Sequence, residues 1–236
     1  MSPMPAKPRS NLIRSICLFC ALVLSLGGCA ILHFQVPPKL AKSSVQYVVD
    51  GQMGFNVDKD LKFGPYRLHD IEVGVTSAQR ETVGTRETVV CRRESSFRFI
   101  AKPANRWTAT CVALTKHFRG ESTDHGHADS HSLACDFVPQ EGKRWALSIK
   151  TQNEGGLAGE ARGEEVDLNV QFQGALRSGV LVRSKGLDVA AASLSRPGKV
   201  WLSKRLFGDE AHAAAASMTA LMLYSETLST DAECAK

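Results

Sequence analysis

The residues best suited to chemistry gather in one short polar stretch, between positions 117 and 131. Four of the seven histidines fall there, and three of them lie in the run from Asp124 to His131. Imidazole and carboxylate groups together form a ligand set suited to zinc or copper. The sequence therefore predicts a candidate metal site made of His125, His127, Asp129 and His131.

The alternative interpretation of this stretch is a solvated loop tip between two strands. His-x-His spacing in a loop does not hold two rings on one face of a helix or strand, and ordering such ligands costs conformational entropy. Recognisable catalytic motifs are absent from the sequence, including Gly-x-Ser-x-Gly, a Gly-rich phosphate loop and His-Glu-x-x-His. Distant residues could still assemble a triad, because triads are defined by geometry. We expect a non-catalytic module.

The N-terminal segment has the layout of a secretory signal. It carries Lys7, Arg9 and Arg14 with no acidic residue, and an apolar run follows from Ile16 to Leu26. Eleven apolar residues are too few to span a bilayer as a mature helix. The stretch Leu26-Gly27-Gly28-Cys29 that ends the segment resembles the lipobox of bacterial lipoproteins.

This resemblance implies that residues 1–28 are a cleaved signal peptide and that Cys29 becomes the acylated first residue. Two or more acyl chains anchor a protein stably, since each buried methylene contributes roughly 0.8 kcal/mol. Ala30, rather than aspartate, follows the cysteine. The resemblance therefore implies the outer membrane, with the domain facing the periplasm. An ordinary secretory signal is the alternative.

Composition after cleavage argues against a nucleic-acid partner. The signal holds three basic residues and no acidic one, so its removal lowers the formal net charge from +5 to +2. A charge so near neutrality gives no electrostatic argument for nucleic-acid binding. We expect a lipidated tether over residues 29–44, one domain over 45–228 and a tail over 229–236. Apolar residues of the tether, Phe34 and Val36 among them, could instead dock on the domain.

Four cysteines remain besides Cys29: Cys91, Cys111, Cys135 and Cys234. An even count in a compartment that permits disulfides favours two bridges, with three possible connectivities. We predict Cys111–Cys135, because both cysteines lie in strand-like runs. The polar segment between them can form a loop that connects two neighbouring strands. Cys91–Cys234 then follows by elimination, and buried free thiols are the alternative.

Short strands are expected over most of the mature chain. Apolar and polar residues alternate with period two at 145–150 and 166–172, which predicts strands with one buried and one wet face. Further strands are expected at 45–49, 66–75, 97–99, 107–114, 133–138, 180–182, 187–194 and 200–202. The polar segment 153–165 is expected to be a flexible loop, and Pro37-Pro38 to keep the tether out of a helix.

The C-terminal segment from about 210 to 228 is predicted to be a helix. Asp209 can cap it, Glu210 suits the positive end of the helix dipole, and nearly all later residues are good helix formers. Apolar residues go almost all the way round, so such a helix must be enclosed on every side. The sequence thus predicts a mainly β (α+β) fold, an antiparallel barrel or sandwich with this helix packed in or against it.

A meander of short strands closed by an apolar helix, just after Gly186, Val189, Ala190, Gly198 and the run Val200-Trp201-Leu202, resembles the tubby C-terminal or scramblase-like barrels. The resemblance covers residues 45 to 228 in layout alone, and it carries over no functional residue. It implies a last helix that runs through the barrel, whereas a sandwich with the helix on one face is the alternative. The expected function is a lipid-anchored module that binds an envelope component. The competing expectation is a zinc- or copper-binding protein using residues 117–131.

Overall fold

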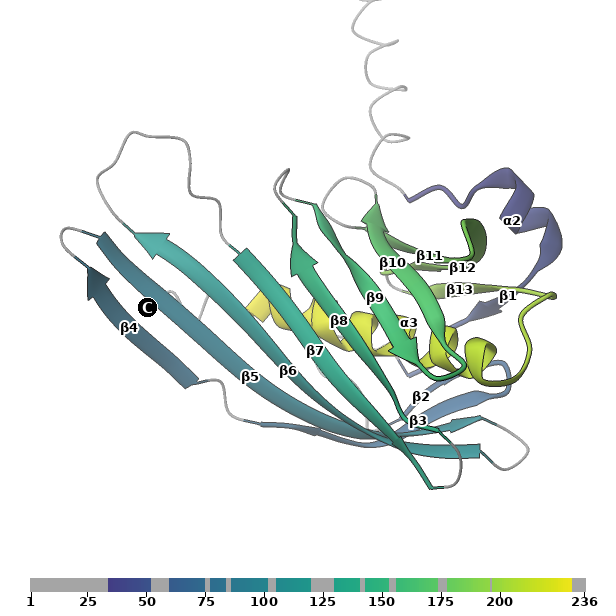
Figure 1. Ribbon diagram of the computed structural model, residues 1–236, viewed down its shortest axis with the longest axis horizontal. Helices are drawn as coiled ribbons and strands as arrows, with labels where there is room; N and C mark the ends of the chain where they lie inside the picture. The colour runs from purple at the N-terminus through teal and green to yellow at the C-terminus, as the bar shows by residue number, and fades with distance from the viewer. Residues whose placement is uncertain are drawn as a thin grey trace, which may run out of the picture.

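The structure is a computed structural model that describes residues 34–51, 60–74, 77–83, 86–101, 105–119, 130–140, 143–152, 156–173, 178–195 and 197–230. One antiparallel sheet dominates it (Figure 1). Its strands are β1 (Ser44–Val48), β2 (Leu61–Phe63), β3 (Tyr66–Val73), β4 (Ser77–Val83), β5 (Arg86–Ala101), β6 (Asn105–Arg119), β7 (Ser130–Pro139), β8 (Trp145–Thr151), β9 (Leu157–Gly163), β10 (Asp167–Gln173), β11 (Gly179–Ser184), β12 (Leu187–Ser193) and β13 (Lys199–Ser203). The helices are α2 (Pro38–Ser43) and α3 (Gly208–Thr230).

The sheet is a meander that curls into a nearly closed barrel. Its strand order is β1-β13-β12-β11-β10-β9-β8-β7-β6-β5-β3-β2, and β4 pairs with β5 outside this path. The two ends meet where the Asp50 N–H donates to the Lys62 carbonyl at 2.8 Å and the Lys62 N–H donates back at 3.0 Å. Closure of this kind leaves few unpaired backbone groups at the sheet edges.

Helix α3 lies inside the curve of the sheet, as Figure 1 shows. Every residue from Ala213 to Met222 is at most 2% exposed, which includes the polar Ser217 and Thr219. The prediction of a helix enclosed on every side is therefore confirmed, and the fold is the barrel rather than the sandwich. Of the described helices, none is long and apolar enough to cross a membrane.

Strand β9 occupies a segment for which the sequence predicted a flexible loop, so that prediction is wrong for residues 157–163. β9 pairs residue by residue with β8 and β10, and it contacts α3. Leu157 and Ala161 are buried, but Gly159 and Gly163 occupy the alternate positions between and beyond them. Because these positions hold small residues next to an alanine-rich helix, the sequence lacks the alternation of apolar and polar residues from which a strand is predicted.

The segment before β1 is docked on the barrel. Pro38 is the first residue of α2, a position where its missing N–H costs nothing, so the expectation that the prolines exclude a helix is wrong. Leu40 is 1% exposed and packs against Leu181 and Ala191 on the outside of β11 and β12. Phe34 and Val36 pack around the same cluster, which is the docked alternative raised by the sequence.

Cys111 and Cys135 are joined by a disulfide, the pairing predicted from the sequence. The two residues face each other across β6 and β7, with Cα atoms 4.0 Å apart, and both are buried on the inner face of the sheet. Cys91 is also disulfide-bonded. Since Cys111 and Cys135 bond to each other, its partner lies outside the described residues, and Cys234 lies there too.

His212 gives the barrel a pH-dependent stability. Its ring lies in α3 against Trp107 and Tyr66, with centroid distances of 5.1 and 6.3 Å, and Asp209 is 3.9 Å away. Burial lowers the pKa of His212 below its ordinary 6.5, and the nearby Asp209 opposes that shift only in part. Below pH 6.5 the unfolded chain therefore takes up a proton more readily than the folded chain, and the folded state loses stability as the pH falls further.

We expect His212→Phe to reduce this loss. Urea unfolding at pH 7.5 and pH 5.0 measures it: the wild-type protein should lose more stability between the two conditions than the variant. The difference in unfolding free energy between the two proteins at pH 7.5 measures the effect of the substitution on packing. Equal losses in both proteins would contradict the prediction.

Candidate functional site

Most of the metal site predicted from the sequence lies outside the described residues. His125, His127 and Asp129 fall there, whereas His131 is described and stands in β7 rather than in a loop. Its backbone N–H donates to Thr151 Oγ1 at 2.7 Å, and its Nδ1 lies 3.3 Å from Thr115 Oγ1. No group of three metal-ligating side chains occurs among the described residues. The metal site stays a prediction.

Calorimetric titration of the protein with zinc and with copper tests that site. If residues 117–131 bind metal, the wild-type protein should release heat and the triple variant His125→Ala, His127→Ala, His131→Ala should not, because imidazole supplies most of the ligand set. If the variant releases as much heat as the wild-type protein, the predicted metal site is wrong.

A strained acidic residue marks the outer face of the sheet. The pairing of β3 with β5 shifts register between His69 and Glu72, and within this bulge Asp70 has a φ of 50°. Left-handed backbone costs a non-glycine residue roughly 1–3 kcal/mol, and strained positions of this kind cluster at functional sites. Bulges themselves re-aim side chains beside such sites.

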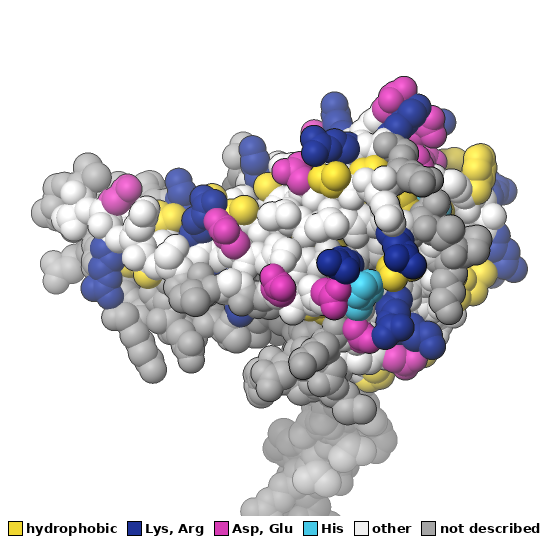
Figure 2. Space-filling model, turned by 90° about the horizontal axis from the view of Figure 1, so that it is seen from below, with side chains coloured by type: hydrophobic (Ala, Val, Ile, Leu, Met, Phe, Trp, Pro, Cys, Tyr) yellow, Lys and Arg dark blue, Asp and Glu magenta, His cyan; other side chains and the backbone are white. Residues whose placement is uncertain are grey.

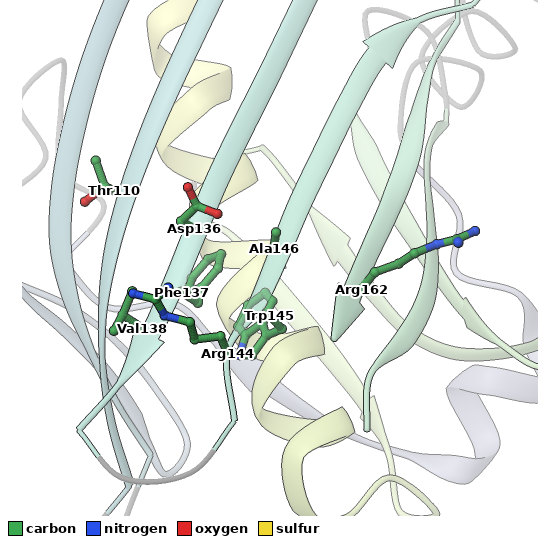
Figure 3. A pocket seen from close by; sticks show the side chains of 8 residues that line it. All are labelled: Thr110, Asp136, Phe137, Val138, Arg144, Trp145, Ala146 and Arg162. Atoms are coloured by element: carbon green, nitrogen blue, oxygen red, sulfur yellow. The ribbon is translucent and has the colours of Figure 1, made fainter. Parts of the chain in front are cut away.

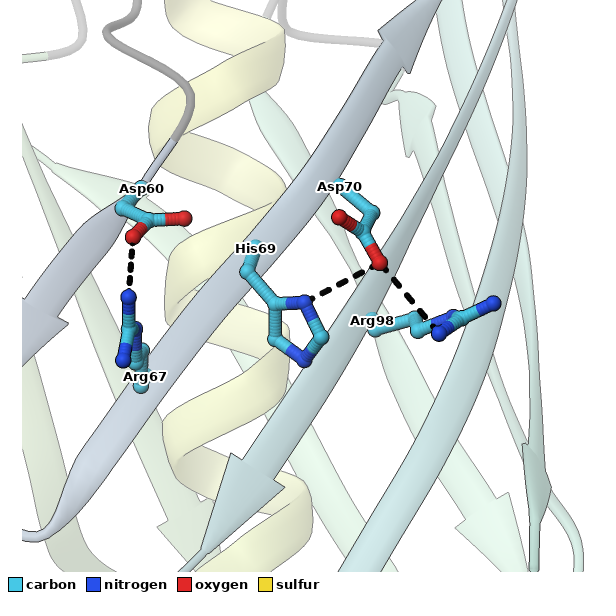
Figure 4. Close-up of polar contacts among 5 residues, drawn as sticks. All are labelled: Asp60, Arg67, His69, Asp70 and Arg98. Carbon is cyan, nitrogen blue, oxygen red and sulfur yellow. Dashed lines mark hydrogen bonds and ion pairs between the residues drawn. The ribbon is translucent and has the colours of Figure 1, made fainter.

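Asp70 is held by two neighbours on this face (Figure 4). Its Oδ2 lies 3.1 Å from His69 Nδ1 and 3.3 Å from Arg98 Nη1. A second ion pair, between Arg67 and Asp60, lies beside the first. The four charged side chains are between 43% and 64% exposed, so these pairs orient polar groups at the surface and add little to stability.

Three shallow hollows extend from this cluster across the outer face of the barrel. One is bounded by Asp70, Glu72 and Arg98, and the next shares Arg98 with it. The third, of about 530 Å³, is bounded by residues of β6 to β9 and shares Val138 with the second. Together they form a continuous surface, which we call the β3–β9 face.

The β3–β9 face offers both donors and acceptors. Figure 3 shows Asp136 and Arg144 on the β7 side of the third hollow, while Arg162 extends from β9 on the other side. Asp136, Arg144 and Arg106 form no ion pair with any described residue. Acidic and basic side chains are interspersed when this side is viewed from below (Figure 2). Such a surface suits a partner that carries charges of both signs.

Strand order places this face across the barrel from the docked segment. α2 packs outside β11, β12 and β13, and in the twelve-strand path β6 is six places from β12. The outer surface around β6 therefore points away from α2, as Figure 1 also shows. The face and the docked segment are on opposite sides of the molecule.

Asp70, Arg98 and their neighbours were not predicted as functional residues from the sequence. No motif surrounds them, and the only available signal was an acidic residue inside the strand expected at 66–75. Comparison of the chain with protein families, with curated proteins and with solved structures finds no match. The β3–β9 face is therefore assigned from the geometry of this chain alone.

Proposed function

We propose that this chain is a bacterial lipoprotein, anchored through acylated Cys29 at the outer membrane, and that its barrel binds another envelope protein through the β3–β9 face. The lipobox-like stretch Leu26-Gly27-Gly28-Cys29 supports the anchor, and Ala30 after the cysteine supports the outer membrane. The role is binding rather than catalysis.

One observation carries the binding role: the three hollows and the strained Asp70 all lie on one face, across the barrel from α2. A lipid anchor at Cys29 holds the α2 side toward the membrane, because only four residues separate Cys29 from Phe34. The β3–β9 face is then turned toward the periplasm, where a partner can reach it. Arg106 and Asp136, which form no ion pair with any described residue, supply interactions of opposite sign with that partner.

A photo-crosslinking amino acid placed at Val138 in living cells tests the proposal. Val138 is 38% exposed on the β3–β9 face, and we expect it to give one discrete crosslinked species. The same residue placed at Val48, 50% exposed on β1, is the matched control and should give none.

A charge reversal sharpens this test. Arg106→Glu should reduce the Val138 adduct roughly tenfold or more, which corresponds to about 1.4 kcal/mol of binding free energy. Lys199→Glu is the matched control, since Lys199 is also exposed and forms no ion pair with a described residue but lies on β13. Adducts of equal yield at Val138 and Val48, or an Arg106 variant that behaves like the Lys199 variant, would overturn the proposed face.

A further inference from the structure

Close packing holds the chain at Phe34. The Phe34 ring lies directly over Gly179 of β11, where a Cβ atom would come within 1.9 Å of the ring. Six residues later Leu40 is buried against Leu181 and Ala191. The path of the chain is thus fixed to the barrel from residue 34 onward.

The distance from this fixed point to the acylated cysteine is short. Five residue steps separate Phe34 from Cys29, and an extended chain spans at most about 3.6 Å per residue, or roughly 18 Å in all. Part of this length lies within the headgroup layer, because the acyl chains are in the hydrocarbon core. The α2 side of the barrel therefore remains close to the lipid headgroups.

The two segments that meet at the end of α2 carry charge of a single sign. Residues 34–49 and 199–207 contain five basic residues and no acidic one. The Lys204 N–H donates to the Ser43 carbonyl at 3.0 Å, which brings Lys204 and Arg205 to the end of α2 that holds Lys42. Lys39, Lys42, Lys204 and Arg205 are all exposed, and none forms an ion pair with a described residue.

We propose that Lys39, Lys42, Lys204 and Arg205 form a headgroup-binding patch that contacts anionic phospholipids of the membrane in which Cys29 is anchored, so that the barrel lies on the bilayer by its α2 side. The inference rests on the proposed lipid anchor. These four basic residues form no ion pair with a described residue. Within a Debye length of about 8 Å from anionic phosphates they are attracted to the membrane, whereas the mixed charges of the β3–β9 face are not.

The test uses the full, purified protein in vesicles of phosphatidylglycerol and in vesicles of phosphatidylcholine. Acetylation rates measured by mass spectrometry report the access of reagent to each lysine. Lys39, Lys42 and Lys204 should react at least threefold more slowly on phosphatidylglycerol than on phosphatidylcholine, an effect that high salt reverses. Two exposed lysines across the barrel, Lys116 and Lys150, are the internal reference and should react equally on both.

A double variant shows whether the patch acts as a unit. In Lys39→Gln, Lys42→Gln the remaining Lys204 should lose most of its protection on phosphatidylglycerol. The matched control Lys116→Gln, Lys150→Gln should leave the protection of Lys204 unchanged. Because α2 keeps its buried Leu40 in the first variant, a loss of protection reports charge rather than unfolding.

The mass of the N-terminal peptide separates this inference from the proposed function. Acylated Cys29 with equal rates at all five lysines would overturn the patch and leave the anchor standing. Equal protection on both kinds of vesicle would overturn the role of anionic headgroups. A Cys29 that carries no acyl chain would overturn the proposed anchor, and the orientation with it.

Discussion

Leu221→Ala should lower the free energy of unfolding by about 2–5 kcal/mol. Leu221 lies in α3 with no exposed surface, enclosed by the barrel. Removing three of its carbon atoms loses their transfer free energy and leaves a cavity that the surrounding strands can close only in part. Urea unfolding followed by circular dichroism measures the change. Leu187→Ala, at a leucine 61% exposed on β12, is the matched control and should change stability by roughly 0.5 kcal/mol or less.

An enclosed helix should also reject larger side chains. Ala214→Leu is expected to destabilise the protein by about 1–3 kcal/mol, since overpacking forces side chains away from their preferred rotamers, and Ala214 has no exposed surface. A helix lying on the outside of a sheet would tolerate such changes on its outward side, whereas the residues on every side of α3 from Ala213 to Met222 are buried. Small effects for both Leu221→Ala and Ala214→Leu would contradict the enclosure of α3.

Loss of the Cys111–Cys135 bridge should cost about 3–4 kcal/mol. The bond closes a loop with a sequence separation of 24, and in the chain-entropy model a loop of this size restricts the unfolded chain by that amount. The double variant Cys111→Ala, Cys135→Ala should therefore unfold at a lower urea concentration with a similar slope. The folded state changes little, because the β6–β7 pairing continues for several residues on either side of the bridge.

Thiol alkylation gives an independent check on the bridge. In the folded wild-type protein, Cys111 and Cys135 should resist alkylation without reductant even after denaturation, and should react once reductant is added. Alkylation of either residue without reductant, or an unfolding curve of the double variant that matches the wild-type curve, would contradict the prediction.

Much of the fold could be predicted from local sequence patterns. Strand β10 alternates strictly between apolar and polar residues, and β8 does so except at Ala146; the structure places the large apolar residues of both strands on the buried face. The helix expected at 210–228 is α3 at 208–230, because an almost uniformly apolar helix has no stable place except an enclosed one. The same period-two alternation brought Cys111 and Cys135 to facing positions on adjacent strands.

Other elements carry no local signal. β9 is held as a strand by the backbone hydrogen bonds of β8 and β10, and a Cβ atom at Gly159 or Gly163 would collide with residues in or just before β8. α2 is only six residues long, too short to be stable alone, and exists because Leu40 finds an apolar patch on β11 and β12. Both elements depend on partners far away in the chain.

The candidate functional residues also divide into those that the sequence shows and those that only the tertiary structure brings together. The histidine stretch was visible because four similar residues stand close together in the sequence, yet of its predicted ligands only His131 falls among the described residues, and it stands in a strand. The β3–β9 face joins residues from Asp60 to Arg162, which no spacing along the chain connects. The backbone strain at Asp70 appears only once β3 is paired with β5.

The sequence by itself determined the β class and the apolar terminal helix and favoured the pairing of Cys111 with Cys135, because periodicity and composition act over a few neighbouring residues. Only the tertiary structure decided that the sheet closes around α3, that α2 is docked, and that the β3–β9 face and the headgroup-binding patch lie on opposite sides. These depend on strand order and on contacts between distant residues, which the cooperative burial of a shared core selects. Local patterns predict the helices and strands, and tertiary packing decides which of their surfaces are in contact.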